Sequence, residues 1–337
     1  MIVVRHRVLL VEPTIQPVGV DILNSHCEVF MACDGKEDTL IQKLNEHQAE
    51  GIITRVEHIT HRILEECPSL RVIQQHGTGM DNIDIFAATA HGVRVQNVPD
   101  GNYISVAEHV VMSILALSRN LIQADAAVRQ GNWKYRESSI PHEIAEKTLL
   151  IIGLGRIGRS VAKKAQAFDM QVIGFDPFVS AEQMEGIGVK KIETLDNGLS
   201  EADYITIQLH LTPETEGMIS TAQLHRMKNT AALINLSRGP VVDQKALYAA
   251  LRDHKIAAAA LDVFEKEPPE FADPLFSLPN VILTPHFGGD TWEAKQRLAK
   301  KAAENLILAL DGVDTYNWAN RTAMEEAGTV TAKSFTL

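Results

Sequence analysis

The stretch TLLIIGLGRIGRSVAKKAQAFDMQVIGFDP, residues 148–177, decides the fold of this chain. Gly153, Gly155 and Gly158 form a GxGxxG pattern between an apolar run and a helical pattern. In this pattern the first glycine permits a tight turn, the second lets the backbone approach a pyrophosphate, and the third lets helix and strand pack closely. The free N–H groups at the helix N-terminus then favour an anion. The stretch predicts a βαβ unit that binds a dinucleotide; a glycine-rich turn without a ligand is the alternative.

Asp176 indicates which dinucleotide this unit would bind. It lies 18 residues after Gly158, at the end of the next apolar run, close to the position where a carboxylate holds ribose hydroxyls. A carboxylate there would repel the 2′-phosphate of NADP, so the pattern favours NAD. The alternative is an aspartate that only forms the turn before Pro177.

The alternation of strand and helix continues on both sides of this stretch. Apolar runs of strand length span residues 148–153, 171–176, 204–209, 231–237, 257–263 and 280–285 in one series, and residues 7–13, 49–55, 70–77 and 93–99 in another. Helical spacing of apolar residues lies between strands, as over residues 38–48 and 61–67. This rhythm predicts parallel sheets, and the six strands of the longer series complete a doubly wound sheet.

A long, strongly apolar helix is predicted over residues 105–131, between the two series. Ser105 and Glu108 match a capping box, and Gly131 can end the helix. Its apolar face is too broad for a surface helix, so we expect it to lie buried between domains.

A second long helix is predicted over residues 292–310, with Asp290 as its N-cap. Two other segments have no place in a sheet. The polar segment 132–146 suggests an arm or an oligomer contact, and the tail from Arg321 has no periodic pattern.

Length and composition limit the possible classes of protein. A chain of 337 residues suits two domains, and 45% apolar with 22% charged residues is typical of a globular protein. The net charge of −11 argues against sequence-independent binding to nucleic acid or to an anionic membrane. No apolar run is long enough to span a bilayer, and Arg5, His6 and Arg7 interrupt the N-terminal run where a signal peptide would be apolar.

The cysteines indicate the compartment. Cys27, Cys33 and Cys67 form no CxxC pair and are odd in number. We therefore expect reduced thiols in the cytoplasm and no metal site.

Three charged or titratable residues, Arg238, Glu267 and His286, each follow a predicted strand of the longer series. Ligands of doubly wound sheets bind at the carboxyl ends of the strands, so we expect all three to face one cleft. An arginine can hold a carboxylate through two parallel hydrogen bonds. A histidine can give or take a proton near neutral pH, and a glutamate on its other ring nitrogen fixes the tautomer. With NAD as the hydride carrier, these are the parts that an oxidoreductase of 2-hydroxy acids requires.

Each of these residues also has a plainer interpretation. Arg238 could be a surface arginine before a loop glycine, and Glu267 lies in the charged run EKEPPE, where a solvated face is usual. A lone histidine such as His286 is more often structural. The shared strand edge is the reason to prefer the catalytic interpretation.

The segments GLGRIG, INLSRGPVVD, ALDVFEKEP and NVILTPHFGGDTWEA resemble the D-isomer-specific 2-hydroxyacid dehydrogenases. The resemblance covers about residues 7–320. It implies Arg238 as the substrate anchor, Glu267 as the histidine partner and His286 as the acid/base.

The resemblance also implies the domain organisation. Its fold has two doubly wound α/β domains. Residues 105–290 would form the Rossmann-type NAD-binding domain. Residues 1–104 and 291–337 would form a discontinuous, flavodoxin-like substrate domain, and the two long helices would be the crossings between domains.

The cofactor contacts implied by the resemblance lie in the glycine loop, at strand ends and in the loop after the last strand. They are Gly153, Gly155, Arg156, Ile157, Gly158, Asp176, His210, Thr212, Asn235, Asp262 and Gly288. The segment QLHLTPET has Gln208 and His210 where many members have histidine and proline. This departure bears on the adenine and loop contacts and not on the chemistry.

The substrate contacts implied by the resemblance lie in the N-terminal series. QHGTGMDNID and NVPDGNYISVAEH are similar to phosphoglycerate dehydrogenase. There the loop at Gly77, Thr78 and Gly79 offers backbone N–H groups to the substrate carboxylate. Arg55 matches a position that helps to bind the anionic end of the substrate; a strand-end arginine without that role is the alternative.

SVAEHVVM also resembles NAD-dependent formate dehydrogenase, in which Asn102 matches a substrate-contacting asparagine. That branch has glutamine in place of Glu267. Because formate oxidation transfers no proton of this kind, Glu267 argues against formate.

The sequence therefore predicts an NAD-dependent enzyme that interconverts a D-2-hydroxy acid and its 2-keto acid. Hydroxypyruvate, glyoxylate and 3-phosphoglycerate are the candidate substrates. An NAD-binding regulatory module of the corepressor kind is the alternative, since such family members keep the same three residues. The resemblance further implies a homodimer. We expect no appended regulatory domain of the kind that many phosphoglycerate dehydrogenases carry.

Overall fold

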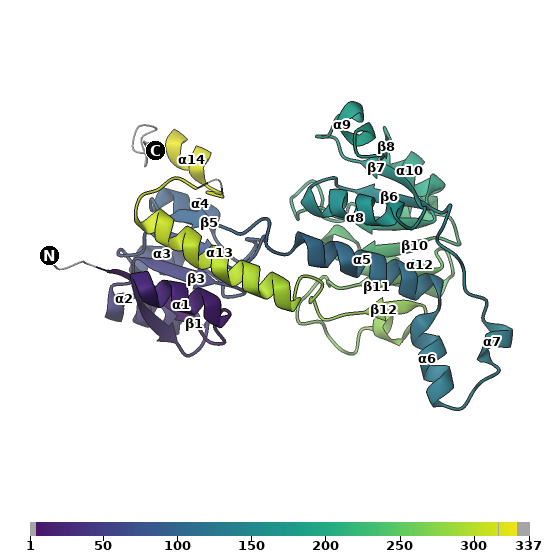
Figure 1. The fold of residues 1–337 in the computed structure, drawn as a ribbon, viewed down its shortest axis with the longest axis horizontal. Coiled ribbons are helices and arrows are strands. Elements are labelled where there is room, and N and C mark those ends of the chain that lie inside the picture. The colour runs from purple at the N-terminus through teal and green to yellow at the C-terminus, as the bar shows by residue number, and fades with distance from the viewer. Residues whose placement is uncertain (1–4, 316, 329–337) are drawn as a thin grey trace. The chain divides into compact units, whose positions relative to one another are not determined.

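The computed structural model describes residues 5–315 and 317–328, and Figure 1 shows the path of the chain. The chain divides into two compact units. Unit 1 combines the residues up to Asn102 with those from Asp290 onwards, and unit 2 runs from Tyr103 to Gly289. Each unit contains one parallel sheet, so the predicted α/β class with two parallel sheets is confirmed.

Unit 1 is built on a five-stranded sheet in the order β2-β1-β3-β4-β5. This is the flavodoxin-like order 2-1-3-4-5, as predicted. The elements of unit 1 are β1 (His6–Val11), α1 (Pro17–His26), β2 (Cys27–Ala32), α2 (Glu37–His47), β3 (Gly51–Thr54), α3 (His61–Glu66), β4 (Val72–Gln75), α4 (Ile85–Ala90), β5 (Arg94–Gln96), α13 (Trp292–Leu310) and α14 (Arg321–Glu326).

Two hydrophobic cores cover the two faces of this sheet, because successive side chains of a strand point to opposite sides. Leu9 and Ile52 pack with residues of α2, α3 and α4. Leu10 and Ile53 pack with residues of α1 and α13. In Figure 1 the yellow-green helix α13 lies alongside α1. A helix from the C-terminal part of the chain thus completes a unit whose strands all come from the N-terminal part.

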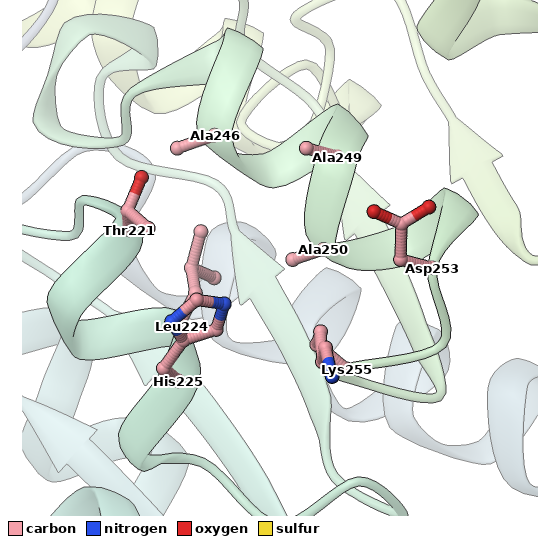
Figure 2. Close-up of a pocket in the computed structure, with 8 residues that line it drawn as sticks. All are labelled: Thr221, Leu224, His225, Ala246, Ala249, Ala250, Asp253 and Lys255. Carbon is pink, nitrogen blue, oxygen red and sulfur yellow. The ribbon is translucent and has the colours of Figure 1, made fainter.

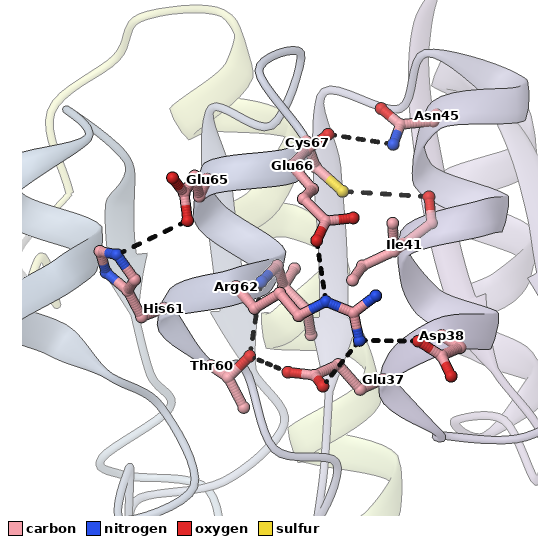
Figure 3. Close-up of polar contacts among 11 residues, drawn as sticks. Glu37, Asp38, Ile41, Asn45, Thr60, His61, Arg62, Glu65, Glu66 and Cys67 are labelled. Atoms are coloured by element: carbon pink, nitrogen blue, oxygen red, sulfur yellow. Dashed lines mark hydrogen bonds and ion pairs between the residues drawn. The ribbon is translucent and has the colours of Figure 1, made fainter.

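The α3 helix shows how polar residues set an element boundary. The Thr60 hydroxyl accepts a hydrogen bond from the N–H of Ile63, 3.4 Å away, and so caps the helix. Arg62 then joins α3 to α2, with contacts of 2.7 Å to Asp38 and 3.2 Å to Glu37 (Figure 3). The Arg62 side chain is about half exposed. Water therefore screens these pairs, which orient the two helices more than they stabilise them.

The segment after α13 covers the edge strand β5. Asn320 accepts a hydrogen bond from the N–H of Val95 at 2.9 Å and donates one to the carbonyl of Val93 at 3.0 Å. A covered edge is protected from pairing with another chain. The helix α14 follows where the sequence shows no periodic pattern, because six residues are too few for a period. The rest of the predicted tail, residues 329–337, lies outside the described residues.

Unit 2 is built on a seven-stranded sheet in the order β12-β11-β10-β9-β6-β7-β8. Counted from β6, this is the Rossmann-type order 3-2-1-4-5-6 with a seventh strand added. The elements of unit 2 are α5 (Tyr103–Ser118), α6 (Leu121–Arg129), α7 (Tyr135–Ser138), β6 (Thr148–Ile152), α8 (Arg156–Gln166), β7 (Gln171–Phe175), α9 (Ala181–Glu185), β8 (Lys190–Lys191), α10 (Leu195–Glu201), β9 (Tyr204–Ile207), α11 (Thr221–Arg226), β10 (Ala232–Asn235), η1 (Gly239–Val241), α12 (Gln244–Arg252), β11 (Ala258–Leu261), η2 (Pro274–Ser277) and β12 (Val281–Leu283).

The structure contains two strands that the sequence prediction lacks, and both lie at sheet edges. In β2 only the end residues, Cys27 and Ala32, are buried. β8 consists of two lysines, Lys190 and Lys191. An edge strand needs little apolar surface, so neither segment shows the apolar run by which buried strands are found.

The helix predicted over residues 105–131 is in fact two helices, α5 and α6. Asn120 lies between them with a φ of 50°, a left-handed conformation that asparagine tolerates. Because α5 begins at Tyr103, Ser105 lies within the helix and the predicted capping box with Glu108 is wrong.

The predicted N-cap of the second long helix is also wrong by one residue. Thr291 caps α13, since its hydroxyl accepts a hydrogen bond from the N–H of Ala294 at 3.2 Å. Asp290 instead pairs with Lys295 at 2.8 Å. Across the residues that the structure describes, no helix has both the length and the apolar character needed to cross a membrane.

Candidate active site

The glycine loop between β6 and α8 has the geometry that its pattern predicts. Gly153 has a φ of +95°, and a Cβ there would lie 2.5 Å from the carbonyl oxygen of Gln208. A Cβ on Gly158 would lie 2.1 Å from the carbonyl oxygen of Gly153. A Cβ on Gly155, in contrast, would meet no atom within 4 Å. The first and third glycines are therefore required by the backbone itself, whereas the second leaves open space at the N-terminus of α8.

Asp176 follows β7 and is tied to this loop. One carboxylate oxygen accepts a hydrogen bond from the N–H of Leu154 at 2.8 Å, and the other accepts one from the N–H of Phe178 at 2.9 Å. The two bonds hold the carboxylate in a fixed orientation beside the glycine loop. This is the location that the sequence predicts for a group that binds ribose hydroxyls.

The loop after β9 carries two further predicted cofactor contacts. The carbonyl of His210 accepts a hydrogen bond from the Thr215 hydroxyl at 2.7 Å, and that hydroxyl accepts one from the N–H of Thr212 at 2.8 Å. At the start of the loop, the Oε1 atom of Gln208 is buried and has no hydrogen-bond partner among the described residues. Because Gln208 also lies against Gly153, this acceptor lies beside the glycine loop.

Arg238, Glu267 and His286 follow β10, β11 and β12, which are neighbours in the sheet. The Nδ1 atom of His286 lies 2.5 Å from Oε2 of Glu267. The other oxygen of Glu267 accepts a hydrogen bond from the N–H of Phe264 at 3.0 Å. The structure thus joins two of the predicted catalytic residues directly, although 19 positions separate them.

The charges of this pair depend on each other. The hydrogen bond to Glu267 raises the pKa of His286, against the opposing effects of burial and of the Arg238 charge. Burial pushes the pKa of Glu267 upward, but the hydrogen bonds from His286 and Phe264 and the positive charges of His286 and Arg238 hold it below its ordinary value. Arg238 is therefore close enough to influence both groups.

A network of backbone bonds sets the turn that carries Arg238. Asn235 donates to the carbonyl of Arg238 at 3.0 Å and accepts from the N–H of Ser237 at 3.1 Å. Gly239 follows, and a Cβ there would lie 1.9 Å from the carbonyl oxygen of Phe264. The turn after β10 is therefore pressed against the segment that leads from β11 to Glu267.

Asp262 has a structural role that the sequence did not indicate. Its carboxylate is buried and accepts hydrogen bonds from the Thr284 hydroxyl at 2.5 Å, the N–H of Phe287 at 3.0 Å and the N–H of Gly288 at 2.8 Å. These partners lie on both sides of His286, which has a φ of 51°. One carboxylate thus holds the loop that presents the histidine in an uncommon backbone conformation.

The predicted substrate contacts of unit 1 are partly joined to one another. The Thr78 hydroxyl lies 3.3 Å from Oδ1 of Asn102. The carbonyl of Gly77 accepts a hydrogen bond from the N–H of Val98 at 2.7 Å. Arg55 follows β3, and its carbonyl accepts a hydrogen bond from the Gln75 side chain at 2.9 Å. The loop that contains Gly79 is therefore fixed to the segment that ends at Asn102.

His76, between β4 and this loop, was missed by sequence reasoning. Its Nε2 atom is buried without a hydrogen-bond partner among the described residues. Burial and the neighbouring charge of Arg55 lower the pKa of His76 to about 4. No spacing rule identifies such a residue, because its significance depends on which groups the fold places around it.

Two other observations concern alternative sites. Figure 2 shows a pocket between α11 and α12 that none of the predicted site residues lines; its lining residues are Thr221, Leu224, His225, Ala246, Ala249, Ala250, Asp253 and Lys255. The described part of the chain contains no group of three or more His, Cys, Asp or Glu side chains that could hold a metal ion. Neither observation competes with the strand-end residues.

The residues present fit a dinucleotide. Gly155 leaves open space where backbone N–H groups meet the N-terminus of the eleven-residue helix α8, which suits a pyrophosphate. Asp176 offers a fixed carboxylate beside the loop, and Gln208 offers an unsatisfied buried acceptor.

Comparisons with known proteins agree with this geometry. The family model for the D-isomer specific 2-hydroxyacid dehydrogenase NAD binding domain matches residues 111–288. The chain is similar to D-3-phosphoglycerate dehydrogenase of Archaeoglobus fulgidus, with 39% identity over 95% of this chain and 60% of the relative. It therefore spans about 60% of the length of that relative.

Two shorter relatives are matched more completely. The glyoxylate reductase of Korarchaeum cryptofilum is 40% identical over 78% of this chain and 80% of its own. The crystal structure of D-lactate dehydrogenase from Aquifex aeolicus, complexed with NAD and lactic acid, superimposes with a TM-score of 0.82 and 29% identity over 90% of this chain and 96% of its own.

Proposed function

Because the chain belongs to the D-isomer-specific 2-hydroxyacid dehydrogenases and contains their NAD-binding domain, we propose that it interconverts a small 2-hydroxy acid and its 2-keto acid. The observation that carries this proposal is the 2.5 Å contact between His286 and Glu267 on the strand edge that also carries Arg238. In this proposal unit 2 holds the cofactor and unit 1 recognises the substrate.

The three strand-end residues divide the work. When bound, NAD accepts or supplies the hydride. Arg238 holds the substrate carboxylate through paired hydrogen bonds. Glu267 engages Nδ1 of His286, so Nε2 is the atom that gives a proton to the carbonyl oxygen during reduction and takes it back during oxidation. The raised pKa of His286 keeps more of the imidazolium available near neutral pH, which favours proton donation.

The proposed cofactor contacts come from unit 2. They are Gly153, Gly155, Arg156, Ile157, Gly158, Asp176, His210, Thr212, Asn235, Asp262 and Gly288. The carboxylate of Asp176 would meet the ribose, and its charge favours NAD over NADP.

The proposed substrate contacts in unit 1 are Arg55, Asn102 and the backbone N–H groups of Gly77, Thr78 and Gly79. They suit a 2-keto acid with a polar third carbon, and hydroxypyruvate, glyoxylate and the phosphoglycerate pair remain the candidates.

His76 favours hydroxypyruvate among these candidates. Its ring bonds to its own backbone, which only Nδ1 can reach, so the buried Nε2 of the neutral ring is an acceptor that needs a donor. A hydroxyl can donate to His76 and accept from Arg55, whereas an ionised phosphate can only accept. A substrate hydroxyl on the third carbon would therefore satisfy both residues.

We also propose that the protein is a homodimer. Unit 2 exposes large apolar side chains along α5, α6 and the segment after them: Met112, Leu121, Ile122, Val128, Trp133 and Ile140. A shallow hollow on α5 is lined in part by Val111, Met112 and Leu115. Exposed apolar surface of this extent is typical of a protein contact.

Initial-rate assays test the proposed function. The wild-type protein should oxidise NADH in the presence of at least one acid from a panel of hydroxypyruvate, glyoxylate, pyruvate and phosphohydroxypyruvate, with hydroxypyruvate preferred and NADPH less effective. Arg238→Ala should raise KM for the acid. If the protein binds NADH but reduces no acid, the regulatory alternative replaces this proposal.

A further inference from the structure

A histidine outside the predicted catalytic residues contacts the loop that carries His286. His109, on α5, places Nε2 3.4 Å from Oγ1 of Thr284. Its ring meets the ring of Phe287 edge to face, with 5.3 Å between centroids and 88° between planes. A Cβ on Gly288 would lie 3.5 Å from Cγ of His109. His109 therefore touches the loop both before and after the catalytic histidine.

The hydrogen bonds around Thr284 have a defined direction. The carboxylate of Asp262 can only accept, so the Thr284 hydroxyl donates to it across 2.5 Å. The oxygen of Thr284 is then left to accept from His109, which requires a proton on Nε2. Burial lowers the pKa of His109 although the charge of Asp262 opposes this. His109 is therefore a neutral imidazole that donates through Nε2 and extends the chain to Thr284 and Asp262.

The loop needs such support because of its conformation. His286 has a φ of 51°, in the left-handed region that residues other than glycine rarely occupy. Asp262 holds the backbone on the C-terminal side of His286 through the N–H groups of Phe287 and Gly288. On the N-terminal side it holds only the hydroxyl of Thr284, and His109 is the second partner of that hydroxyl.

We propose that His109 is a positioning residue for His286. Through Thr284 and Phe287 it keeps the loop in the conformation in which Nδ1 of His286 reaches Glu267. His109 touches neither group of that pair directly, and it acts only through the loop. The effect on turnover rests on the proposed function above, whereas the effect on the His286 imidazole does not.

Titration of the histidine rings by NMR, in the full chain without substrate, tests the proposal directly. The His286 signal is identified by its absence from His286→Asn. His109→Phe keeps an aromatic ring against Phe287 and removes the donor, so the contact with Glu267 should weaken. The pKa of His286 should then fall toward its ordinary value, because that contact is the main cause of its increase. His109→Gln, which keeps an N–H donor, should restore the wild-type value.

The same variants are then compared in turnover. His109→Phe should lower kcat by about two- to tenfold, the range expected for one lost hydrogen bond. KM for the keto acid should stay unchanged, because Arg238 is not disturbed. His109→Gln should recover most of kcat. Thr284→Val should match His109→Phe, and the double variant should be no worse than either, since both remove the same connection.

The possible results are distinguishable. An unchanged His286 pKa in His109→Phe would overturn the proposal, whether or not the melting temperature falls, since a purely structural role lowers stability alone. Fully additive losses in His109→Phe and Thr284→Val would also overturn it. If the wild-type protein reduces no keto acid, the proposed function fails while the titration still decides the role of His109.

Discussion

At the scale of the residue, the account depends on the pairing of His286 with Glu267. The glutamate raises the pKa of the histidine through a hydrogen bond, and the positive charges of His286 and Arg238 help to lower the pKa of the glutamate. Both shifts favour the ion pair over the neutral pair. For reduction of a keto acid this means that His286 starts protonated over a wider pH range than a free histidine.

The pH dependence of reduction follows from the sign of this shift. Reduction needs protonated His286, so kcat should be high below the raised pKa and fall as the pH rises through it. Glu267→Gln removes the main cause of the shift, so the fall should move to lower pH and kcat should drop by roughly tenfold or more. Glu270→Gln, at a side chain that is 78% exposed, is the control. A Glu267→Gln profile that coincides with the wild-type profile would contradict the assigned role.

Asp176 leads to a prediction about cofactor choice. Its carboxylate lies beside the glycine loop and would repel a 2′-phosphate. Asp176→Ser should therefore reduce the preference for NADH over NADPH by about tenfold or more, the effect of about 1.4 kcal/mol. The ratio of kcat/KM for the two cofactors measures this change. A wild-type preference for NADPH, or an unchanged ratio in the variant, would exclude this role of Asp176.

At the scale of the element, the turn from β6 to α8 separates folding from binding. A Cβ on Gly158 would collide with the backbone of Gly153, whereas a Cβ on Gly155 would meet nothing within 4 Å. The two glycines belong to one motif but serve different purposes. Gly158 lets α8 pack on the strand, and Gly155 leaves space for a ligand.

Alanine at each glycine tests this separation. Gly158→Ala should lower Tm by roughly 2–12 °C, because overpacking costs about 1–3 kcal/mol in a unit of this size. Gly155→Ala should keep the wild-type Tm but weaken NADH binding by about tenfold or more. Thermal unfolding and a fluorescence titration with NADH measure the two effects. Gly155→Ala protein that binds NADH normally would show that the open space is not the phosphate site.

At the scale of the whole molecule, the sequence predicts two parallel-sheet units because buried strands leave apolar runs and GxGxxG marks the first strand of the Rossmann-type sheet. It misses β2 and β8, since edge strands need little apolar surface. It also joins α5 and α6, because the left-handed turn at Asn120 leaves no break in the apolar pattern.

The candidate site shows the same division. Arg238, Glu267 and His286 were predictable because their residue types follow strand ends. The contacts of Asp262 and His109 were not, because both reach a loop that is distant in the sequence.

The assembly of the whole molecule is also open to test. Sedimentation velocity should give a particle of twice the chain mass of 37.1 kDa. Ile122→Asp, within the exposed apolar surface of α6, should shift the protein toward the monomer because it places a charge where apolar contact is proposed. Phe86→Asp, at an exposed apolar side chain of unit 1, should leave the assembly unchanged. A monomeric wild-type protein would refute the dimer.

The central claim is that His286 transfers the proton while a keto acid is reduced, and the rate of NADH oxidation in wild type and in His286→Asn tests it most directly. The account predicts turnover of a 2-keto acid by the wild-type protein. It also predicts a loss of kcat of about 10²–10⁴-fold in the variant, with NADH binding retained. Equal rates in the two proteins, or no turnover of any 2-keto acid by the wild type, would contradict it.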